Sequence, residues 1–369
     1  MIDHLNPIFF VVYCLPTTQA TAFRLHDSSH KIFLLLRPHR KCGNDSREES
    51  IMKSTDKTKD RFPTIVIVAR HGERLDYVQA AQGQNFVATA KRPWDPPLTE
   101  HGKEQAHKLG RQIAKECQRL GIAPLQAIFS SPFLRVRQTA AFARQGYHQE
   151  QQSTSVSAVK NERQPDNYVV PLVQVEMGLS ESINASWYRS WALRGSDGTW
   201  GYTPKNKNDL TDPATFHPMS RQPVQAILDW KKTVMLVDNN EFSQEHENDD
   251  ACQYYDLEYE SQTKITLPYC FGSDPPLLES AEDQMSRMQA TIEKVHVPGQ
   301  TVLLVSHGGP VTHLFEALTG KHWKQHGVST YCCYSIYQQK SIDATTTWEP
   351  LVVNESKFLH EELLKEVHV

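Results

Sequence analysis

The stretch that decides the fold is residues 64–74, TIVIVARHGER, in which a β-branched apolar run passes directly into a polar sequence. The run Thr64–Ala69 is apolar on both faces, which is typical of a central parallel strand covered on both sides. The same arrangement occurs twice more: QAIFS (Gln126–Ser130) precedes SPFLR, and TVLLVS (Thr301–Ser306) precedes HGG. We therefore expect three buried strands that each end in polar groups.

Amphipathic helices are predicted between these strands. Residues 100–120 have apolar side chains on one face, with Thr99 as the N-cap and Gly121 as the stop. Three further helices are expected, at Arg135–Arg144, Met285–Val295 and Val311–Leu318. An extended segment is expected at Val169–Glu176. This alternation predicts a three-layer α/β/α fold, in which a mostly parallel central sheet carries helices on both faces.

Two parts of the chain depart from the alternation. YCCYSIYQ and TTWEPLVV read as strands of an edge hairpin, followed by a final helix around Lys357–Glu366. We interpret residues 182–275 as a large insertion over the edge where the strands end, with one helix at Pro223–Val237. Part of it, residues 238–260, is acidic, contains neither Lys nor Arg, and is predicted to be partly a mobile loop.

Composition excludes several classes of protein. The chain has 369 residues, 39% hydrophobic and 22% charged, which is typical of a globular protein. A formal net charge of -4 argues against nucleic-acid binding, because phosphate-backbone binders concentrate basic charge. Seven cysteines without a CxxC pair make no disulfide scaffold, and no apolar run approaches the ~20 residues of a membrane span. We therefore expect a cytoplasmic protein.

Residues 1–61 read as an extension ahead of a domain that spans residues 62–369. The stretch Lys41–Arg61 is almost wholly polar, which is typical of a linker. Residues 6–23 have a short apolar core followed by small residues, as at the end of a signal peptide, but MIDH lacks the usual Lys or Arg. Two interpretations of the extension stay open: a disordered leader, or a targeting segment within residues 1–23.

The polar groups after the three strands are expected to converge, because ligands bind where the carboxyl ends of parallel strands meet. His71, His307 and the guanidinium groups of Arg70 and Arg135 would come together there, with glycines that let the backbone approach a ligand. Forked guanidinium donors match phosphate oxygens, so the predicted ligand is a phosphoryl group. An imidazole among them is a candidate nucleophile.

In order and placement these motifs resemble those of the histidine phosphatase superfamily, which has a phosphoglycerate-mutase-like fold. RHG follows the first strand, SSPFLRVRQTA the second and SHGG a late one, with PPLTEHGKEQA between the first two. RHGER together with VEMGLSES is similar in particular to the phosphatase domain of the ubiquitin-associated and SH3-domain-containing suppressors of T-cell-receptor signalling. The resemblance covers residues 62–351 and implies only that catalytic module.

The resemblance implies a role for each matched residue. His71 would take the phosphoryl group, and Glu181 in VEMGLSES would protonate the leaving group, with Glu176 as a rival by position. The phosphate oxygens would be bound by Arg70, Arg74, Arg135 and His307. We expect His71 to be exposed at its strand end and neutral, with its other ring nitrogen donating to a backbone carbonyl. Arg137 is interpreted as a surface residue.

The implied function is metal-independent hydrolysis of phosphate monoesters, without a cofactor, on phosphotyrosine or a small phosphorylated metabolite. One alternative is a phosphoglycerate-mutase-type isomerase, although Arg74 and Tyr77 stand where mutases carry Ser and Asn, and EERxYG is absent. The other is a catalytically silent phosphate-binding module. The expected partner is the substrate, with no nucleic acid and no membrane span, and a homodimer is left open.

Overall fold

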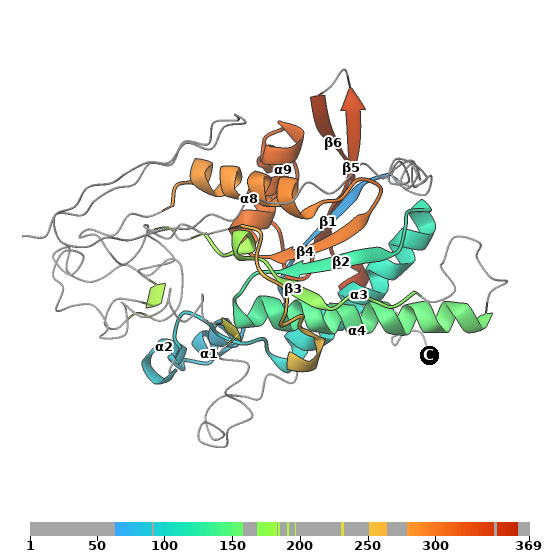
Figure 1. The fold of residues 1–369 in the computed structure, drawn as a ribbon. Coiled ribbons are helices and arrows are strands. Elements are labelled where there is room, and N and C mark those ends of the chain that lie inside the picture. The colour runs from blue at the N-terminus through green and yellow to red at the C-terminus, as the bar shows by residue number, and fades with distance from the viewer. Residues whose placement is uncertain are drawn as a thin grey trace, which may run out of the picture. The chain divides into compact units, whose positions relative to one another are not determined.

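A computed structural model of the chain describes residues 63–90, 92–157, 168–182, 184, 190–191, 196, 230–231, 251–263, 279–342 and 345–360. All of them belong to the unit Asp56–Val369. Their core is one six-stranded sheet with helices on both faces (Figure 1). The predicted three-layer α/β fold is confirmed.

The sheet joins four parallel strands to an antiparallel hairpin. In spatial order the strands are β3 (Val173–Val175), β2 (Leu125–Ser130), β4 (Thr301–Ser306), β1 (Ile65–Arg70), β5 (Tyr334–Ile342) and β6 (Thr345–Glu355). The first four run parallel, whereas β5 is antiparallel to β1 and β6 to β5. Every residue of β4 is buried, as expected of a strand covered on both faces. The predicted edge hairpin is present.

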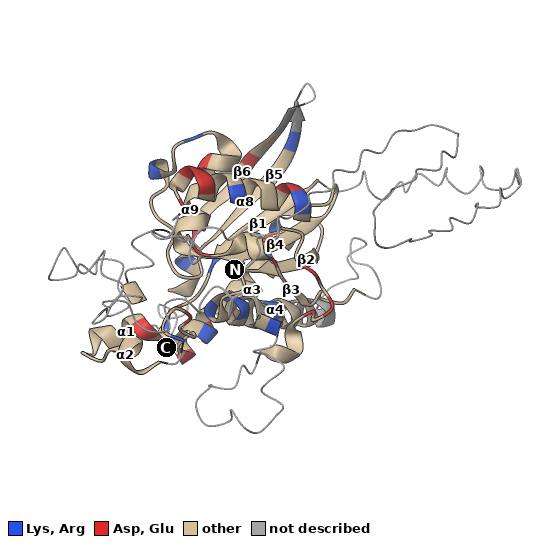
Figure 2. Cartoon of the chain, turned by 60° about the vertical axis from the view of Figure 1, so that its left-hand side comes forward, with Lys and Arg blue, Asp and Glu red and all other residues tan. Residues whose placement is uncertain are grey.

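Two long helices cover each face of the sheet. They are α3 (Glu100–Leu120) and α4 (Leu134–Ser157) on one face, and α8 (Ala281–Val295) and α9 (Gly308–Thr319) on the other. Alternate side chains of β1 enter the two cores, with Ile65 and Ile67 on the α3–α4 side and Val66 and Val68 opposite. In Figure 2 the charged residues lie mainly on the helices, whereas the central strands β2 and β4 have none.

Short elements complete the described structure. Helices α1 (Leu75–Ala81) and α2 (Phe86–Thr89) follow β1, and single 3₁₀ turns lie at Met177–Leu179, Cys252–Tyr254, Trp323–Gln325 and Lys357–Leu359. The last of these corrects a prediction, because a helix was expected to begin around Lys357. Its remaining residues 361–366 lie outside the described part of the chain.

Both ends of α3 lie where they were predicted, because capping residues in the sequence determine them. Thr99 Oγ1 accepts a hydrogen bond from the Gly102 N–H, and Gly121 ends the helix in the left-handed conformation, with φ at 64°. In contrast, α4 continues to Ser157, past the predicted end at Arg144. A Cβ on Gly146 would lie 2.0 Å from the carbonyl oxygen of His107, so this glycine allows the close packing of α4 on α3.

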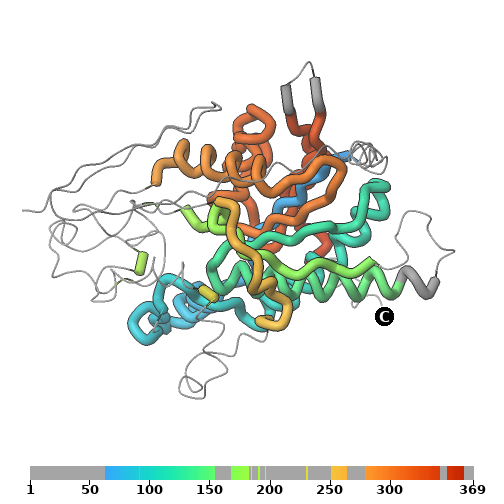
Figure 3. The backbone as a smooth tube through the Cα atoms, viewed as in Figure 1, coloured from blue at the N-terminus to red at the C-terminus, as the bar shows by residue number. Residues whose placement is uncertain are grey.

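Part of the acidic segment has a defined structure. Residues 251–263 run beside β3 (Figure 3), and Tyr255 forms a parallel bridge with Val173. Residues 238–250 and all of the predicted helix Pro223–Val237 except Trp230 and Lys231 lie outside the described residues.

Several further features concern only the described ranges. No helix there combines the length and apolar character that crossing a membrane requires. The cysteines in these ranges are free thiols, namely Cys117, Cys252, Cys332 and Cys333. No group of three or more His, Cys, Asp or Glu side chains in them is arranged to hold a metal ion.

Candidate functional site

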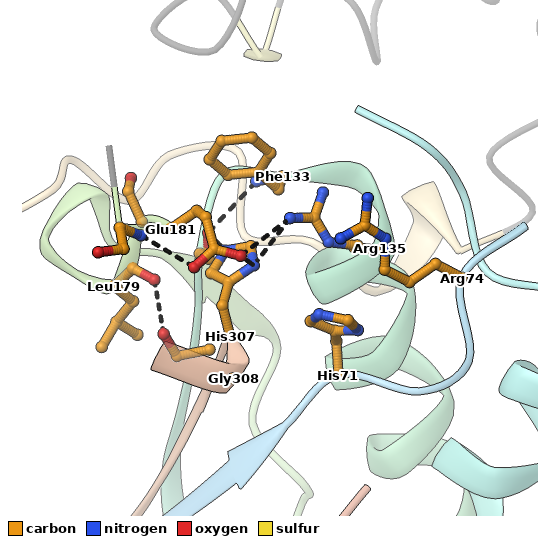
Figure 4. A network of polar contacts seen from close by, with 12 residues as sticks. His71, Arg74, Phe133, Arg135, Leu179, Glu181, His307 and Gly308 are labelled. Atoms are coloured by element: carbon orange, nitrogen blue, oxygen red, sulfur yellow. Dashed lines mark hydrogen bonds and ion pairs between the residues drawn. The ribbon is translucent and has the colours of Figure 1, made fainter. Parts of the chain in front are cut away.

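The three strand ends meet at one edge of the sheet. β4 lies between β1 and β2 and runs parallel to both. The N–H of His71, after β1, donates to the Ser306 carbonyl at 3.0 Å, and the N–H of Ser131, after β2, donates to the Val305 carbonyl at 3.1 Å. The ring centroids of His71 and His307 are 5.5 Å apart. The strand register therefore brings the two predicted histidines together, as Figure 4 shows.

The loop after β1 is held by the first two turns of α3 and its N-cap, Thr99. The Glu73 N–H donates to the Gln105 side chain at 2.9 Å, and the Glu73 carboxylate accepts from the Thr99 hydroxyl at 2.7 Å. A Cβ on Gly72 would lie 2.6 Å from the carbonyl oxygen of Gly102, so the two segments approach too closely for any other residue. This packing explains physically why PPLTEHGKEQA accompanies RHGER.

A backbone contact determines which ring nitrogen of His71 carries the hydrogen. Its Nδ1 lies 2.8 Å from the Gly72 carbonyl oxygen, and a carbonyl only accepts, so Nδ1 carries the hydrogen. Nε2 of the neutral ring then keeps its lone pair. The predicted contact with a backbone carbonyl is confirmed. The predicted exposure is wrong, because only 1% of His71 is exposed.

The surroundings of His71 keep it neutral. Burial lowers the pKa of His71 well below its ordinary value of 6.5, and the charges of Arg135, Arg70 and Arg74 lower that pKa further. An imidazolium would lose hydration and be repelled by these guanidinium groups. At neutral pH the ring is therefore uncharged, which is the form of imidazole that acts as a nucleophile.

Arg135 is a fully buried cation with unused donors. Its Nη2 lies 3.0 Å from Nδ1 of His307 and 3.5 Å from Oε2 of Glu181. Its Nε and Nη1, like the Nε of Arg70, make no hydrogen bond to any residue in the described ranges. Burial lowers the pKa of Arg135 to about 10, so it stays charged at neutral pH. Buried charged donors are stabilised when an anion accepts from them.

His307 links the second strand end to the acidic residue (Figure 4). Its Nε2 lies 2.8 Å from Ser131 Oγ, and its Nδ1 lies 3.3 Å from Oε2 of Glu181 as well as near Arg135. Because a guanidinium only donates, Nδ1 accepts from Arg135 and Nε2 carries the hydrogen. Burial, followed by the charge of Arg135, lowers the pKa of His307 well below 6.5, in agreement with a neutral ring.

Two carboxylates follow β3, and only Glu181 lies in this network. Its Oε1 accepts from the Ser182 N–H at 2.9 Å, while Oε2 faces the arginine and histidine. Glu176 is fully buried and instead accepts from the N–H or hydroxyl groups of Gly178, Tyr259, Ser261, Gln262 and Thr263. Glu176 thus anchors residues 251–263 to the end of β3.

Two tyrosines that the motifs did not identify pack on the outer arginines. Arg74 donates to both carboxylate oxygens of Asp76, and its guanidinium lies 4.1 Å from the ring centre of Tyr77. The guanidinium of Arg70 lies 4.6 Å from the ring centre of Tyr331. Asp76, the last residue of RHGERLD, could have been recognised from the sequence as a partner of Arg74. Tyr331 lies in the loop before β5, where no motif marks it.

Arg137 is buried, which corrects its interpretation as a surface residue. Only 1% of it is exposed, and its Nε donates to the Pro132 carbonyl at 3.1 Å. Its guanidinium lies 5.4 Å from the ring centre of Trp230 and 5.3 Å from that of Tyr255. Arg135 enters the site, whereas Arg137, two residues later, packs on the aromatic residues of the insertion.

Residues 66–155 match the sequence profile of the histidine phosphatase superfamily (branch 1). That range contains the RHGER and SPFLR motifs and the whole of α3. The match covers less than half of the chain, and the name of the superfamily describes a class of phosphatases. No curated protein sequence matches the chain at a significant level.

Solved phosphatase structures resemble the chain at low identity. The ecdysone phosphate phosphatase of Bombyx mori, in complex with tungstate, is 16% identical, with 79% of this chain and 93% of that one covered and a TM-score of 0.43. A mycobacterial glucosyl-3-phosphoglycerate phosphatase is 17% identical, with 79% of this chain and 100% of that one covered and a TM-score of 0.38. The Entamoeba histolytica phosphoserine phosphatase is 14% identical, with 80% of this chain and 99% of that one covered and a TM-score of 0.37. Similarity at this level carries no argument about the activity of this chain.

Proposed function

We propose that the chain is a metal-independent phosphatase that hydrolyses phosphate monoesters through a phosphohistidine on His71. The observation that carries this proposal is the neutral imidazole of His71 beside Arg135, whose Nε and Nη1 have no partner among the described residues. A nucleophile next to preorganised donors for an oxyanion is the arrangement that phosphoryl transfer requires.

In the proposed site, cationic and polar side chains hold the phosphoryl oxygens. These residues are Arg70, Arg74, Arg135 and His307, and His307 can donate to phosphate once its Nε2 hydrogen leaves Ser131 Oγ or its Nδ1 takes up a proton. During transfer, negative charge spreads over three oxygens, and fixed guanidinium groups stabilise it without reorganising. The arginines therefore supply the positive charge that a divalent metal ion supplies in other phosphatases.

The first step transfers the phosphoryl group to the enzyme. The lone pair of His71 Nε2 attacks phosphorus in line with the ester oxygen, and the P–O bond breaks as the N–P bond forms. Glu181 donates a proton to the departing oxygen, so the alcohol leaves uncharged. The short network from Glu181 to His307 and Arg135 supports this assignment, because it holds the carboxyl group beside the phosphate site.

The second step regenerates the enzyme. A water molecule attacks phosphorus, and Glu181, now a carboxylate, takes its proton. The N–P bond breaks, the electron pair returns to Nε2 of His71, and inorganic phosphate is released. Both steps thus use the same nucleophile and the same acid–base group.

We extend the proposal to substrate and organisation. The substrate would be phosphotyrosine or a small phosphorylated metabolite, in keeping with the resemblance to the phosphatase domain of the T-cell-receptor signalling suppressors. Tyr77 and Tyr331, both half-buried beside arginines, offer apolar ring faces to an aromatic leaving group. A single catalytic domain over residues 62–369, an extension over residues 1–61 and a cytoplasmic location stay predictions of the sequence.

An assay of the purified chain in excess chelator tests the proposal. The substrates are 4-nitrophenyl phosphate, a phosphotyrosine peptide and 3-phosphoglycerate. We expect phosphate release from the first two without added metal. Conversion of 3-phosphoglycerate to 2-phosphoglycerate would favour the mutase alternative, binding of the phosphopeptide without turnover would favour the silent module, and activity that needs a divalent ion would contradict the metal-independent mechanism.

A further inference from the structure

Glu181 lies at the end of a short turn that has little regular structure of its own. The preceding residues form a single 3₁₀ turn, Met177–Leu179. The backbone carbonyls along this turn are used by side chains from elsewhere. Ser306, the last residue of β4, donates from its hydroxyl to the Leu179 carbonyl at 2.8 Å. Arg287 of α8 donates hydrogen bonds to three other backbone carbonyls of this segment.

Arg287 uses its whole guanidinium to hold this turn. Its Nη1 donates to the carbonyls of Gly178, at 2.6 Å, and Ser180, at 3.1 Å, while Nη2 donates to the carbonyl of Glu181 itself at 3.3 Å. On its other side, Nε and Nη2 donate to the two carboxylate oxygens of Glu279, at 2.7 and 2.8 Å. The five N–H groups of a guanidinium match these five contacts.

We propose that Arg287 is a positioning residue that places the Glu181 carboxyl group for proton transfer. The inference rests on the proposed function, because it needs Glu181 to be the acid. None of the five hydrogen bonds of Arg287 goes to His71, Arg135 or His307. Arg287 therefore acts through the backbone of Glu181 and not on the phosphoryl group.

The charge of Arg287 is paired with a carboxylate, although it also contributes slightly to the lowered pKa of His307, so the test must keep the charge constant while it changes the geometry. Glu279 forms a bidentate ion pair with Arg287, and the two side chains are 9% and 13% exposed, respectively. A lysine would keep a positive charge for Glu279 but cannot reach three carbonyls at once, because its ammonium lacks the planar fork. Arg287→Lys therefore separates positioning from charge.

The test compares leaving groups. We expect Arg287→Lys to lower kcat/KM on an alkyl phosphate about 100-fold, because a misplaced catalytic group costs on that order. On 4-nitrophenyl phosphate, whose leaving group needs no proton, kcat/KM should fall by less than about threefold. The comparison uses kcat/KM because this quantity reports the first step alone, whereas kcat also contains the second step, in which Glu181 acts on every substrate. Glu279→Gln, which keeps the arginine but loosens it, should show the same selectivity more weakly, and it decides the question if Arg287→Lys does not fold.

Arg144→Lys is the matched control. Arg144 likewise ties two backbone carbonyls, those of Val170 and Pro171, but these precede β3 and lie away from Glu181 in sequence. It should leave both substrates unaffected. Equal loss on both substrates for the Arg287 and Glu279 variants would overturn the positioning role. If Glu181→Gln shows no leaving-group selectivity, both the acid role of Glu181 and the positioning role of Arg287 are contradicted. If Glu181→Gln shows this selectivity but the Arg287 and Glu279 variants do not, only the positioning role is contradicted.

Discussion

Arg135 and Glu181 form a long ion pair inside the protein, with 3.5 Å between Nη2 and Oε2, although 0% and 4% of the two side chains are exposed. The same Nη2 lies closer, at 3.0 Å, to Nδ1 of His307. The arginine is therefore directed at the imidazole, and its hold on the carboxylate is loose. A carboxyl group held in this way can exchange a proton with a leaving group while the guanidinium keeps donors for phosphate.

Glu181→Gln should separate alkyl from aryl substrates. An alkoxide leaves poorly without a proton, so we expect a loss of about 10²- to 10⁴-fold in kcat/KM on an alkyl phosphate. A nitrophenolate departs unaided, and the loss on 4-nitrophenyl phosphate should be much smaller. Steady-state kinetics on the pair of substrates gives the comparison. Equal damage on both would mean that Glu181 positions phosphate or supports the fold.

Glu176→Gln is the control for that experiment and carries its own expectation. The buried carboxylate accepts from five groups, and an amide would turn an N–H toward some of those donors. We expect the free energy of unfolding to fall by about 1–3 kcal/mol. The remaining folded enzyme should treat alkyl and aryl substrates as the wild type does. Selective loss on the alkyl ester would move the acid role to Glu176.

Binding of an oxyanion should stabilise the protein through Arg135. Vanadate or phosphate at 100 times its Kd adds about 2.7 kcal/mol to the free energy of unfolding. Arg135→Lys keeps the charge but loses the unused donors on Nε and Nη1, so most of this stabilisation should disappear. Thermal melting with and without the anion measures the effect, with Arg144→Lys as the control. A full response in Arg135→Lys would place the anion elsewhere.

Acid should destabilise the anion-free protein through its buried histidines. In the fold, the pKa of His71 and of His307 lies well below 6.5, mainly because of burial. As pH falls below 6.5, the unfolded chain binds protons that the folded rings do not, so stability falls by at most about 1.4 kcal/mol per pH unit for each ring. Urea unfolding between pH 7.5 and 5 should show this slope, and His71→Asn should reduce it. An unchanged slope would mean that His71 is protonated in the fold.

The parts of the fold that could be predicted are those with local chemical signals. The apolar runs of β1, β2 and β4 and the capped ends of α3 are read from a few neighbouring residues. The reach of α4 was missed because it depends on packing against α3 at Gly146. The helix expected to begin around Lys357 was wrong at its start, because Lys357–Leu359 forms one 3₁₀ turn instead.

The site shows the same division between local and long-range information. His71, Arg135 and His307 could be predicted because each follows a strand end that must meet the others. Glu181 could not be separated from Glu176 by sequence, since the difference depends on residues 259–263, which bind Glu176 from far along the chain. Arg137 was misplaced because its partners belong to the insertion.

The chemical identity of the phosphoenzyme is the most direct test of the proposed nucleophile. Rapid quench with a ³²P-labelled aryl phosphate should give label that is acid-labile and alkali-stable, located on His71 by mass spectrometry and absent from His71→Ala. Because Nδ1 donates to Gly72, ³¹P NMR should find the phosphoryl group on Nε2. Acid-stable label, a phosphoryl group on Nδ1, or label that persists in His71→Ala would contradict the mechanism.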